Sequence, residues 1–438
     1  MLLNAADKAL WRLAIPMIFS NITVPLLGLV DTAVIGHLDS PVYLGGVAVG
    51  ATATSFLFML LLFLRMSTTG LTAQAWGAKD PQRLARALVQ PLALALGAGV
   101  LIILLRLPLI DLALHIVGGS EAVLEQARRF LEIRWLSAPA SLANLVLLGW
   151  LLGVQYARAP VILLVVGNLL NIVLDLWLVM GLRMNVQGAA LATVTAEYAT
   201  LIIGLLMAKR VLTLRGVSLA MLKNAWRGDL RRLLALNRDI MLRSLLLQLC
   251  FGALTVFGAR LGSDIVAVNA VLMTMLTFTA YALDGFAYAV EAHSGQAYGA
   301  RDGSQLLEVW RAACRQSGMV ALAFALIYSL AGQYIIALLT SLPSLQQLAD
   351  RYLIWQTILP VVGVWCYLLD GMFIGATRGA EMRNSMAVAA AGFAVTLLTL
   401  PVLGNHGLWL ALAVFLALRG LSLALIWRRH WRRGTWFS

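Results

Sequence analysis

The sequence predicts an all-α integral membrane protein of twelve transmembrane helices, arranged as two six-helix lobes that are related by an internal repeat. The 438 residues are 61% hydrophobic and 12% charged, with a mean hydropathy of +0.86. A soluble domain has about 45–50% apolar and about 25% charged residues. The apolar residues fall in twelve long runs, and a nine-residue motif occurs once in each half of the chain.

Each apolar run is long enough to cross a bilayer, which takes about 20 residues as a helix. The predicted spans lie approximately at 13–36, 43–66, 87–110, 133–155, 160–181, 187–208, 239–260, 265–290, 314–340, 352–376, 385–403 and 406–427. The first run carries Asp31 and no small-residue cleavage pattern follows it, so we expect a first span rather than a secretory signal. Outer-membrane strands would instead alternate over short segments.

Basic residues concentrate after the even-numbered spans, as with Lys209 and Arg210 after the sixth and Arg428 and Arg429 after the twelfth. The odd-numbered loops carry few of them. This positive-inside pattern predicts a bacterial inner-membrane protein with both termini in the cytoplasm. The net charge of +13 therefore indicates topology and contact with anionic lipid, and no binding of nucleic acid is expected.

The repeat is clearest in two matching segments. Residues 72–80 are Thr-Ala-Gln-Ala-Trp-Gly-Ala-Lys-Asp and residues 294–302 are Ser-Gly-Gln-Ala-Tyr-Gly-Ala-Arg-Asp, at an offset of 294 − 72 = 222. Each half holds six spans, which predicts an axis along the membrane normal and a substrate path between the halves. The predicted organisation is an N-terminal lobe at 1–208, a cytoplasmic linker at 209–237 and a C-terminal lobe at 238–438. We expect the motif to have a structural and gating role, with its glycine at a helix C-terminus.

Polar residues inside the predicted spans are functional candidates, because a charge at the centre of a membrane helix costs about 2.5–3.5 kcal/mol on insertion scales. Asp31 lies in the first span, Asn171 and Asp175 lie one turn apart in the fifth, and Thr193 lies in the sixth. At 1.5 Å per residue, Asp31, Asp175 and Thr193 should all lie about 9 Å below the outer surface. The sequence thus predicts that these helices meet in one polar layer.

The second copy lacks this layer. By the repeat offset, Asp31 corresponds to Leu254 and Thr193 to Leu412, while Asn171 and Asp175 correspond to positions near Ala390 and Ala394. Packing demands are similar in both copies, so packing alone does not explain the polar residues. Hydrogen bonding between helices is the alternative explanation.

The layer has the chemistry to hold a coupling ion. Two carboxylates in a low-dielectric site could share one proton, and together with the amide and hydroxyl oxygens they could instead hold sodium. These residues do not decide between the two ions, so proton coupling and sodium coupling both remain open at this point. The histidines lie near span ends or in loops, so no metal site is expected beyond possible sodium at Asp31, Asn171, Asp175 and Thr193.

Further intramembrane residues form a second tier. Pro16, near the inner end of the first span, predicts a kink that could act in gating. Glu197 lies one turn from Thr193. Asp370 lies inside the tenth span, where it could either contact a cation or substrate or form an ion pair between helices. Arg243 is expected to extend its side chain to the cytoplasmic interface.

The chain resembles the multidrug and toxic compound extrusion (MATE) transporters, in their DinF-like branch, over essentially its whole length. The residues that carry the resemblance are Ile15-Pro16, Val30-Asp31-Thr-Ala-Val-Ile-Gly-His37, Gln74-Ala-Trp-Gly-Ala-Lys79, Asn171-Ile-Val-Leu-Asp175, Gly188-Ala-Ala-Leu-Ala-Thr193 and Asp370-Gly-Met-Phe-Ile-Gly-Ala-Thr-Arg378. The resemblance implies cation-linked residues in the N-terminal lobe at Asp31, Asn171, Asp175 and Thr193. It also implies bending of the first span on protonation. In another branch an aspartate matching Asp370 pairs with a glutamate in span seven, where this chain has only Gln248.

Taken together, these features predict a secondary active multidrug efflux antiporter rather than an enzyme. It would exchange organic, often cationic or amphipathic compounds for protons or sodium by alternating access, without a cofactor and as a monomer in the lipid bilayer. The alternative is a flippase for lipid-linked precursors, which would need a strongly cationic central cavity. A polyprenyl transferase would need clustered loop aspartates for magnesium, and a membrane metalloprotease would need a motif such as His-Glu-x-x-His; neither occurs.

Overall fold

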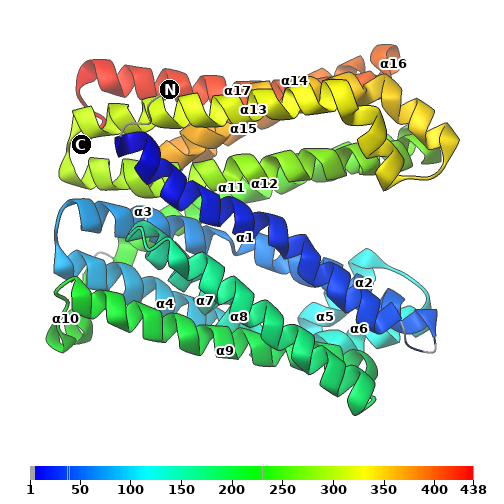
Figure 1. Ribbon diagram of the computed structural model, residues 1–438, viewed down its shortest axis with the longest axis horizontal. Coiled ribbons are helices and arrows are strands. Elements are labelled where there is room, and N and C mark those ends of the chain that lie inside the picture. The colour runs from blue at the N-terminus through cyan, green and yellow to red at the C-terminus, as the bar shows by residue number, and fades with distance from the viewer. Residues whose placement is uncertain (1–4, 37, 39, 229, 438) are drawn as a thin grey trace. The chain divides into compact units, whose positions relative to one another are not determined.

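The computed structural model describes residues 5–36, 38, 40–228 and 230–437, and within the first helix it leaves the side chains of 23–33 and 36 undescribed. These ranges are helical nearly throughout and contain no β-strand (Figure 1). The first half contains α1 (Ala5–Gly36), α2 (Pro41–Leu60), α3 (Phe63–Gly77), α4 (Pro81–Leu104), α5 (Arg106–Val117), α6 (Glu121–Arg134), η1 (Trp135–Ser137), α7 (Ala138–Gly153), α8 (Arg158–Asp175), η2 (Leu176–Gly181), α9 (Asn185–Leu214) and α10 (Leu219–Asn224).

The second half is built from fewer and longer helices. These are α11 (Leu230–Leu261), α12 (Ser263–Ala300), α13 (Gly303–Leu339), α14 (Pro343–Gly375), α15 (Gly379–Thr396), η3 (Leu397–Thr399), α16 (Leu400–Leu403) and α17 (Asn405–Arg433). Several helices extend well beyond the apolar runs that predicted them, because polar residues at the membrane surface can continue a helix once it has formed.

Among the described residues, eleven helical stretches are long and apolar enough to cross a membrane. The 32-residue α1 is a further long helix and covers the first predicted span. The predicted all-α membrane fold is therefore confirmed. Five predicted spans are interrupted rather than smooth. The chain breaks between α2 and α3 at Leu61 and Leu62 and between α4 and α5 at Leu105. In the other three, η1 is a 3₁₀ turn before α7, α8 continues into the π-helical η2, and the 3₁₀ turn η3 separates α15 from α16.

The described chain forms two compact units. We call them the N-terminal unit, residues 22–233, and the C-terminal unit, residues 5–21 together with 234–437. The first part of α1 thus packs in the C-terminal unit, whereas the sequence-based boundary had placed it in the N-terminal lobe. The linker predicted at 209–237 contains the end of α9, the short α10 and the start of α11.

Two features hold the start of α1 in the C-terminal unit. Asp7 is 1% exposed, accepts a hydrogen bond from Arg315 Nη2 at 3.0 Å, and also accepts from Gln316 Nε2. Gly285 on α12 lets α1 approach closely, since a Cβ at this position would lie 2.9 Å from the backbone nitrogen of Ile18. These contacts come from side chains some three hundred residues away, which a local sequence pattern does not reveal.

The repeated motif forms the same turn in both units. After α3, Lys79 takes the left-handed conformation at φ 54°, and the carboxylate of Asp80 then accepts hydrogen bonds from the backbone N–H groups of Gln82 and Arg83. An aspartate in this position caps the first turn of the next helix. The motif glycine Gly77 is the last residue of α3, at a helix C-terminus as predicted, and the left-handed conformation falls on the basic residue two positions later.

The second copy repeats this turn in detail. Arg301 has φ 53°, and Asp302 Oδ1 accepts from the backbone N–H of Gln305 at 3.1 Å. The preceding helix ends at Ala300, one residue beyond the motif glycine. The motif is therefore a helix-turn-helix joint, in which the terminal aspartate starts the third span of each half.

The motif aromatic residues also have matching contacts. The guanidinium of Arg215, just after α9, lies 3.6 Å from the ring centre of Trp76. In the C-terminal unit, Trp436, just after α17, lies edge-on to Tyr298 at 6.1 Å. The two contacting residues are separated by 436 − 215 = 221 positions, close to the repeat offset. In each unit the motif thus receives the segment that follows the sixth span.

Candidate functional site

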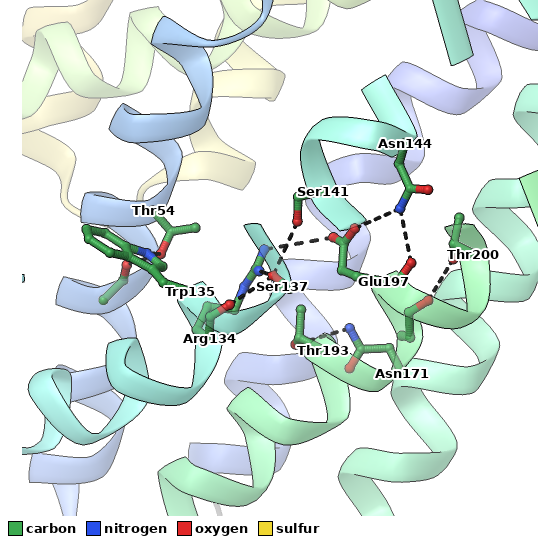
Figure 2. A network of polar contacts seen from close by, with 12 residues as sticks. Thr54, Arg134, Trp135, Ser137, Ser141, Asn144, Asn171, Thr193, Glu197 and Thr200 are labelled. Atoms are coloured by element: carbon green, nitrogen blue, oxygen red, sulfur yellow. Dashed lines mark hydrogen bonds and ion pairs between the residues drawn. The ribbon is translucent and has the colours of Figure 1, made fainter. Parts of the chain in front are cut away.

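The predicted polar residues of the fifth and sixth spans meet in the N-terminal unit. Asn171 and Asp175 lie one turn apart near the end of α8, and their side chains are 2% and 1% exposed. Asn171 Nδ2 donates to Thr193 Oγ1 of α9 at 3.4 Å (Figure 2). The Thr193 hydroxyl donates to the backbone carbonyl of Ala189 at 3.2 Å. The amide and the hydroxyl therefore join α8 to α9.

The backbone changes form at this point. Asp175 is the last residue of α8, and the six residues Leu176–Gly181 continue as a π-helix. A π-helical segment widens the turn, and such segments occur frequently at functional sites. The carboxylate of Asp175 thus projects from the junction between two helical forms.

The side chain of Asp31 lies outside the described residues, so its predicted convergence with Asp175 stays a prediction. The backbone of α1 continues through this position to Gly36. One hydrophobic cluster includes Ile35 of α1, Val179 of η2 and Ala189 of α9. Each of these residues lies four positions, or about one helical turn, from Asp31, Asp175 or Thr193 respectively. Side chains of α1, η2 and α9 therefore pack together in the apolar layer that lies one turn from the predicted polar layer.

Glu197 takes part in a separate network one turn away. Asn144 Nδ2 of α7 donates to Glu197 Oε2 and to the Glu197 carbonyl, each at 3.1 Å, and Arg134 Nη2 lies 3.9 Å from Glu197 Oε1. Arg134 also donates to Ser137 Oγ, which is paired with Ser141 (Figure 2). Glu197 is thus charge-balanced by an arginine that the sequence pattern did not link to it.

Asp370 lies in the C-terminal unit in contact with two arginines. Its Oδ2 accepts from Arg243 Nη2 of α11 and from Arg419 Nη2 of α17, and all three residues are less than 8% exposed. Of the two possibilities left open for Asp370, the structure thus contains the ion pair. The expectation for Arg243 was wrong, because its guanidinium is directed inward to this carboxylate rather than to the interface.

Pro16 lies within α1, which is a continuous helix from Ala5 to Gly36. The described residues contain no group of three or more His, Cys, Asp or Glu side chains that could hold a metal ion. The donor set predicted for sodium includes the Asp31 side chain and stays a prediction. Asn171 Oδ1 is buried and accepts no hydrogen bond from the described residues, so it has a lone pair available to a cation.

Buried carboxylate, amide and hydroxyl groups within the helices of a multi-pass membrane protein are candidate functional groups, because such groups are costly inside a bilayer. The family model MatE matches residues 16–177 and 240–403, one segment in each half. The chain therefore belongs to the MatE family of transporters.

Relatives support the same assignment. The chain is 87% identical over 436 residues to DNA damage-inducible protein F of Escherichia coli strain K12, with 100% of this chain and 95% of that protein covered. This similarity confirms the DinF-like resemblance to an enterobacterial protein. The chain is also 23% identical to the probable multidrug resistance protein NorM of Acinetobacter baylyi, covering 96% of this chain and 94% of that protein.

The fold agrees with a solved member of the family. A crystal structure of MATE in the bent conformation superposes with a TM-score of 0.85 at 24% identity, covering 98% of this chain and 96% of that chain. At this identity the similarity supports the twelve-helix fold and no finer property.

Sequence reasoning missed Arg419, which completes the contacts of Asp370, and the pairing of Asn144 with Glu197. A signal for Arg419 was present, because it is a charge well inside the predicted span 406–427. Its partner could not be identified, since the helix register that brings α11, α14 and α17 together depends on packing between nearly uniformly apolar surfaces.

Proposed function

We propose that this chain is a secondary active multidrug efflux transporter of the bacterial inner membrane, exchanging organic, often cationic or amphipathic compounds for protons by alternating access. The observation that carries the proposal is the buried contact between Asn171 and Thr193, one turn from the buried Asp175. Family membership and the multidrug resistance name of a NorM relative support the substrate class.

The two copies of the repeat differ at these positions in a way that favours ion coupling. Leu254, Leu412 and Ala390, the counterparts of the polar residues, all belong to the apolar core of the C-terminal unit. The same scaffold can therefore pack without polar groups. Placing a carboxylate in this layer costs free energy in the membrane, and binding of a coupling ion would account for its presence.

The proposed mechanism assigns one task to each group. Asp175, with Asp31 as its proposed neighbour, takes up the proton, since two carboxylates in a dry site cannot both ionise cheaply. Asn171 and Thr193 hold α9 against α8 and direct oxygen atoms toward the ion. Protonation would then change the packing of α1, where Pro16 removes a backbone hydrogen bond and allows the helix to bend. Sodium is the alternative coupling ion for the same oxygens.

The flippase alternative would require a strongly cationic central cavity for a pyrophosphate. The buried arginines of the C-terminal unit, Arg243 and Arg419, are instead in contact with the carboxylate of Asp370. Their charge is thus partly balanced within the protein, which favours drug efflux over flipping.

The test is drug efflux from proteoliposomes under proton and sodium gradients that are imposed separately. We expect Asp31→Asn and Asp175→Asn each to abolish nearly all coupled efflux while membrane insertion stays normal. Asp264→Asn is the matched control, because it makes the same substitution at an exposed position in the first turn of α12. Efflux at the wild-type rate in both site variants would refute the proposed coupling role. If the substitutions abolish efflux that is driven by a sodium gradient and leave efflux under a proton gradient unchanged, sodium is identified as the coupling ion.

A further inference from the structure

The last two turns of α17 in the C-terminal unit concentrate basic side chains at an end that the charge pattern predicts to be cytoplasmic (red in Figure 1). Four arginines are exposed there, and we call them the arginine cluster: Arg428, Arg429, Arg432 and Arg433. None of the four forms an ion pair or a hydrogen bond with the residues that the structure describes. Their charge is therefore available to a partner outside the described chain.

One exposed face of α17 changes from apolar to basic along its length. Leu421 and Leu425 are each 56% exposed. Arg428 follows Leu425 after three residues and Arg432 follows after four more, so the four side chains form one stripe along the helix. Exposed leucines within a membrane span contact lipid chains, and arginines at the end of the span reach the headgroups. The stripe thus presents apolar and charged surfaces in the order in which a phospholipid has them.

A row of aromatic side chains lies at the same level of α17. The rings of Trp427 and Trp431 stack with their centres 5.4 Å apart, and Trp310 of α13 lies 6.1 Å from Trp427. Gly434, at φ 66°, ends the helix and turns the chain back, so that the ring of Phe437 lies 6.3 Å from that of Trp431. Tryptophan is enriched at membrane–water interfaces. The row therefore indicates that the arginine cluster lies at the level of the lipid headgroups.

The internal repeat shows that the scaffold does not need this concentration of residues. At the offset of 412 − 193 = 219 that relates the sixth and twelfth spans, the first two arginines of the cluster match Lys209 and Arg210. The other two arginines and the two tryptophans of α17 match residues that are neither basic nor aromatic: Thr213, Leu214, Ala208 and Leu212. The basic pair that both copies share already supplies the positive-inside signal. The additional arginines and tryptophans of α17 therefore call for a further explanation.

The chemistry of this surface fits an anionic phospholipid. Guanidinium groups bind phosphate through paired N–H donors, and the inner leaflet of a membrane attracts basic side chains. Glu381 contacts this end of α17, but its carboxylate is paired with Arg378 at 3.0 Å and with His430 at 2.9 Å rather than with the arginine cluster. The exposed leucines of the same stripe match an acyl chain, which a nucleic acid or a free phosphate does not have.

We propose that the cytoplasmic end of α17 is a binding site for an anionic phospholipid of the inner leaflet. Arg428 and Arg432 hold the phosphate group, and an acyl chain lies along Leu425 and Leu421. The aromatic row fixes the depth of this helix end in the membrane. The site lies in the C-terminal unit and is independent of the proposed coupling residues in the N-terminal unit.

The experiment measures lipid binding to the full-length protein in detergent by native mass spectrometry, with added phosphatidylglycerol or phosphatidylcholine. The site variant is Arg428→Gln with Arg432→Gln. The control is Lys209→Gln with Arg210→Gln, which removes the same charge from exposed positions at the corresponding end of α9. A single Arg432→Gln variant and circular dichroism keep the test valid if the double variant folds poorly.

We expect the wild type to retain phosphatidylglycerol over phosphatidylcholine, and the site variant to bind it more weakly by on the order of 30-fold for two arginines. The control should stay within about twofold of the wild type, and the single variant should fall between the control and the site variant. Equal losses in the site and control variants would overturn the proposal, because charge at any cytoplasmic helix end would then suffice. Inorganic phosphate is titrated in a separate arm: saturable binding that is lost in the site variant, without retained lipid, would overturn the assignment to lipid.

Discussion

At the scale of single residues, the two units treat buried charge in different ways. In the N-terminal unit Asp175 and Asn171 are buried, and Asn171 donates a hydrogen bond to the hydroxyl of Thr193. In the C-terminal unit Asp370 is in contact with two arginines. A carboxylate that accepts hydrogen bonds from two guanidinium groups has its charge balanced within the protein. This difference supports assigning ion coupling to the N-terminal unit and a stabilising role to Asp370.

Replacing Asp370 tests this assignment. Asp370→Asn leaves Arg243 and Arg419 buried without their shared carboxylate, and removing one partner of a buried ion pair costs about 3–5 kcal/mol. We expect a clearly lower thermal unfolding midpoint of the detergent-solubilised protein. Adding Arg419→Gln to this variant should recover part of the loss, because one fewer buried charge then lacks its partner. Unchanged stability together with lost efflux would instead make Asp370 a transport residue.

At the scale of helices, close packing depends on glycines where backbones meet. Gly99 on α4 is buried against α7, and a Cβ there would come within 2.5 Å of the backbone nitrogen of Pro139. Gly97, two residues earlier on α4, has nothing within 4 Å of the position of its Cβ. Packing thus requires a glycine at position 99 but not at position 97 of the same helix.

We expect Gly99→Ala to destabilise the protein by about 1–3 kcal/mol, because α4 and α7 must move apart to admit the methyl group. Gly97→Ala should be neutral or should stabilise by up to about 1 kcal/mol, since alanine favours the helix. Thermal unfolding of both variants in the same detergent gives the comparison. Equal midpoints for the two would contradict the close contact between α4 and α7.

The repeated motif shows how an element can be predicted in kind but not in detail. The sequence indicated a helix end and a turn at both copies, and the structure has both. The left-handed residue is Lys79 or Arg301 rather than the glycine, and the following aspartate caps the next helix. Which residue takes the positive φ depends on where the preceding helix stops, and local composition fixes that boundary only to within a residue or two.

At the scale of the whole molecule, the charge pattern predicts an orientation that can be measured directly. The substitution Glu121→Cys places a cysteine in an odd-numbered loop, and we expect this cysteine to react with a membrane-impermeant maleimide on intact cells. A cysteine at Lys223→Cys, in the linker, should react only after the membrane is permeabilised. Both positions are exposed, and Cys250, Cys314 and Cys366 are replaced by alanine beforehand. The reverse labelling pattern would invert the proposed topology.

The sequence by itself determined the membrane class, the spans, the internal duplication and the polar residues of the fifth and sixth spans. Apolar runs, charge between them and a repeated motif are properties of the chain alone, and they do not depend on which helix touches which. Asp175 and Thr193 could be assigned to one depth because a helix rises by a fixed distance per residue.

Only the tertiary structure decided the partners. The ion pairs of Asp370 with two arginines, the packing of the start of α1 in the C-terminal unit and the hydrogen bond from Gln90 to Trp226 all join residues far apart in the chain. Membrane helices are apolar on nearly every face, so periodicity does not reveal which face meets a neighbour. Close packing at small residues and a few buried polar contacts make that choice, and these form only when the helices are assembled.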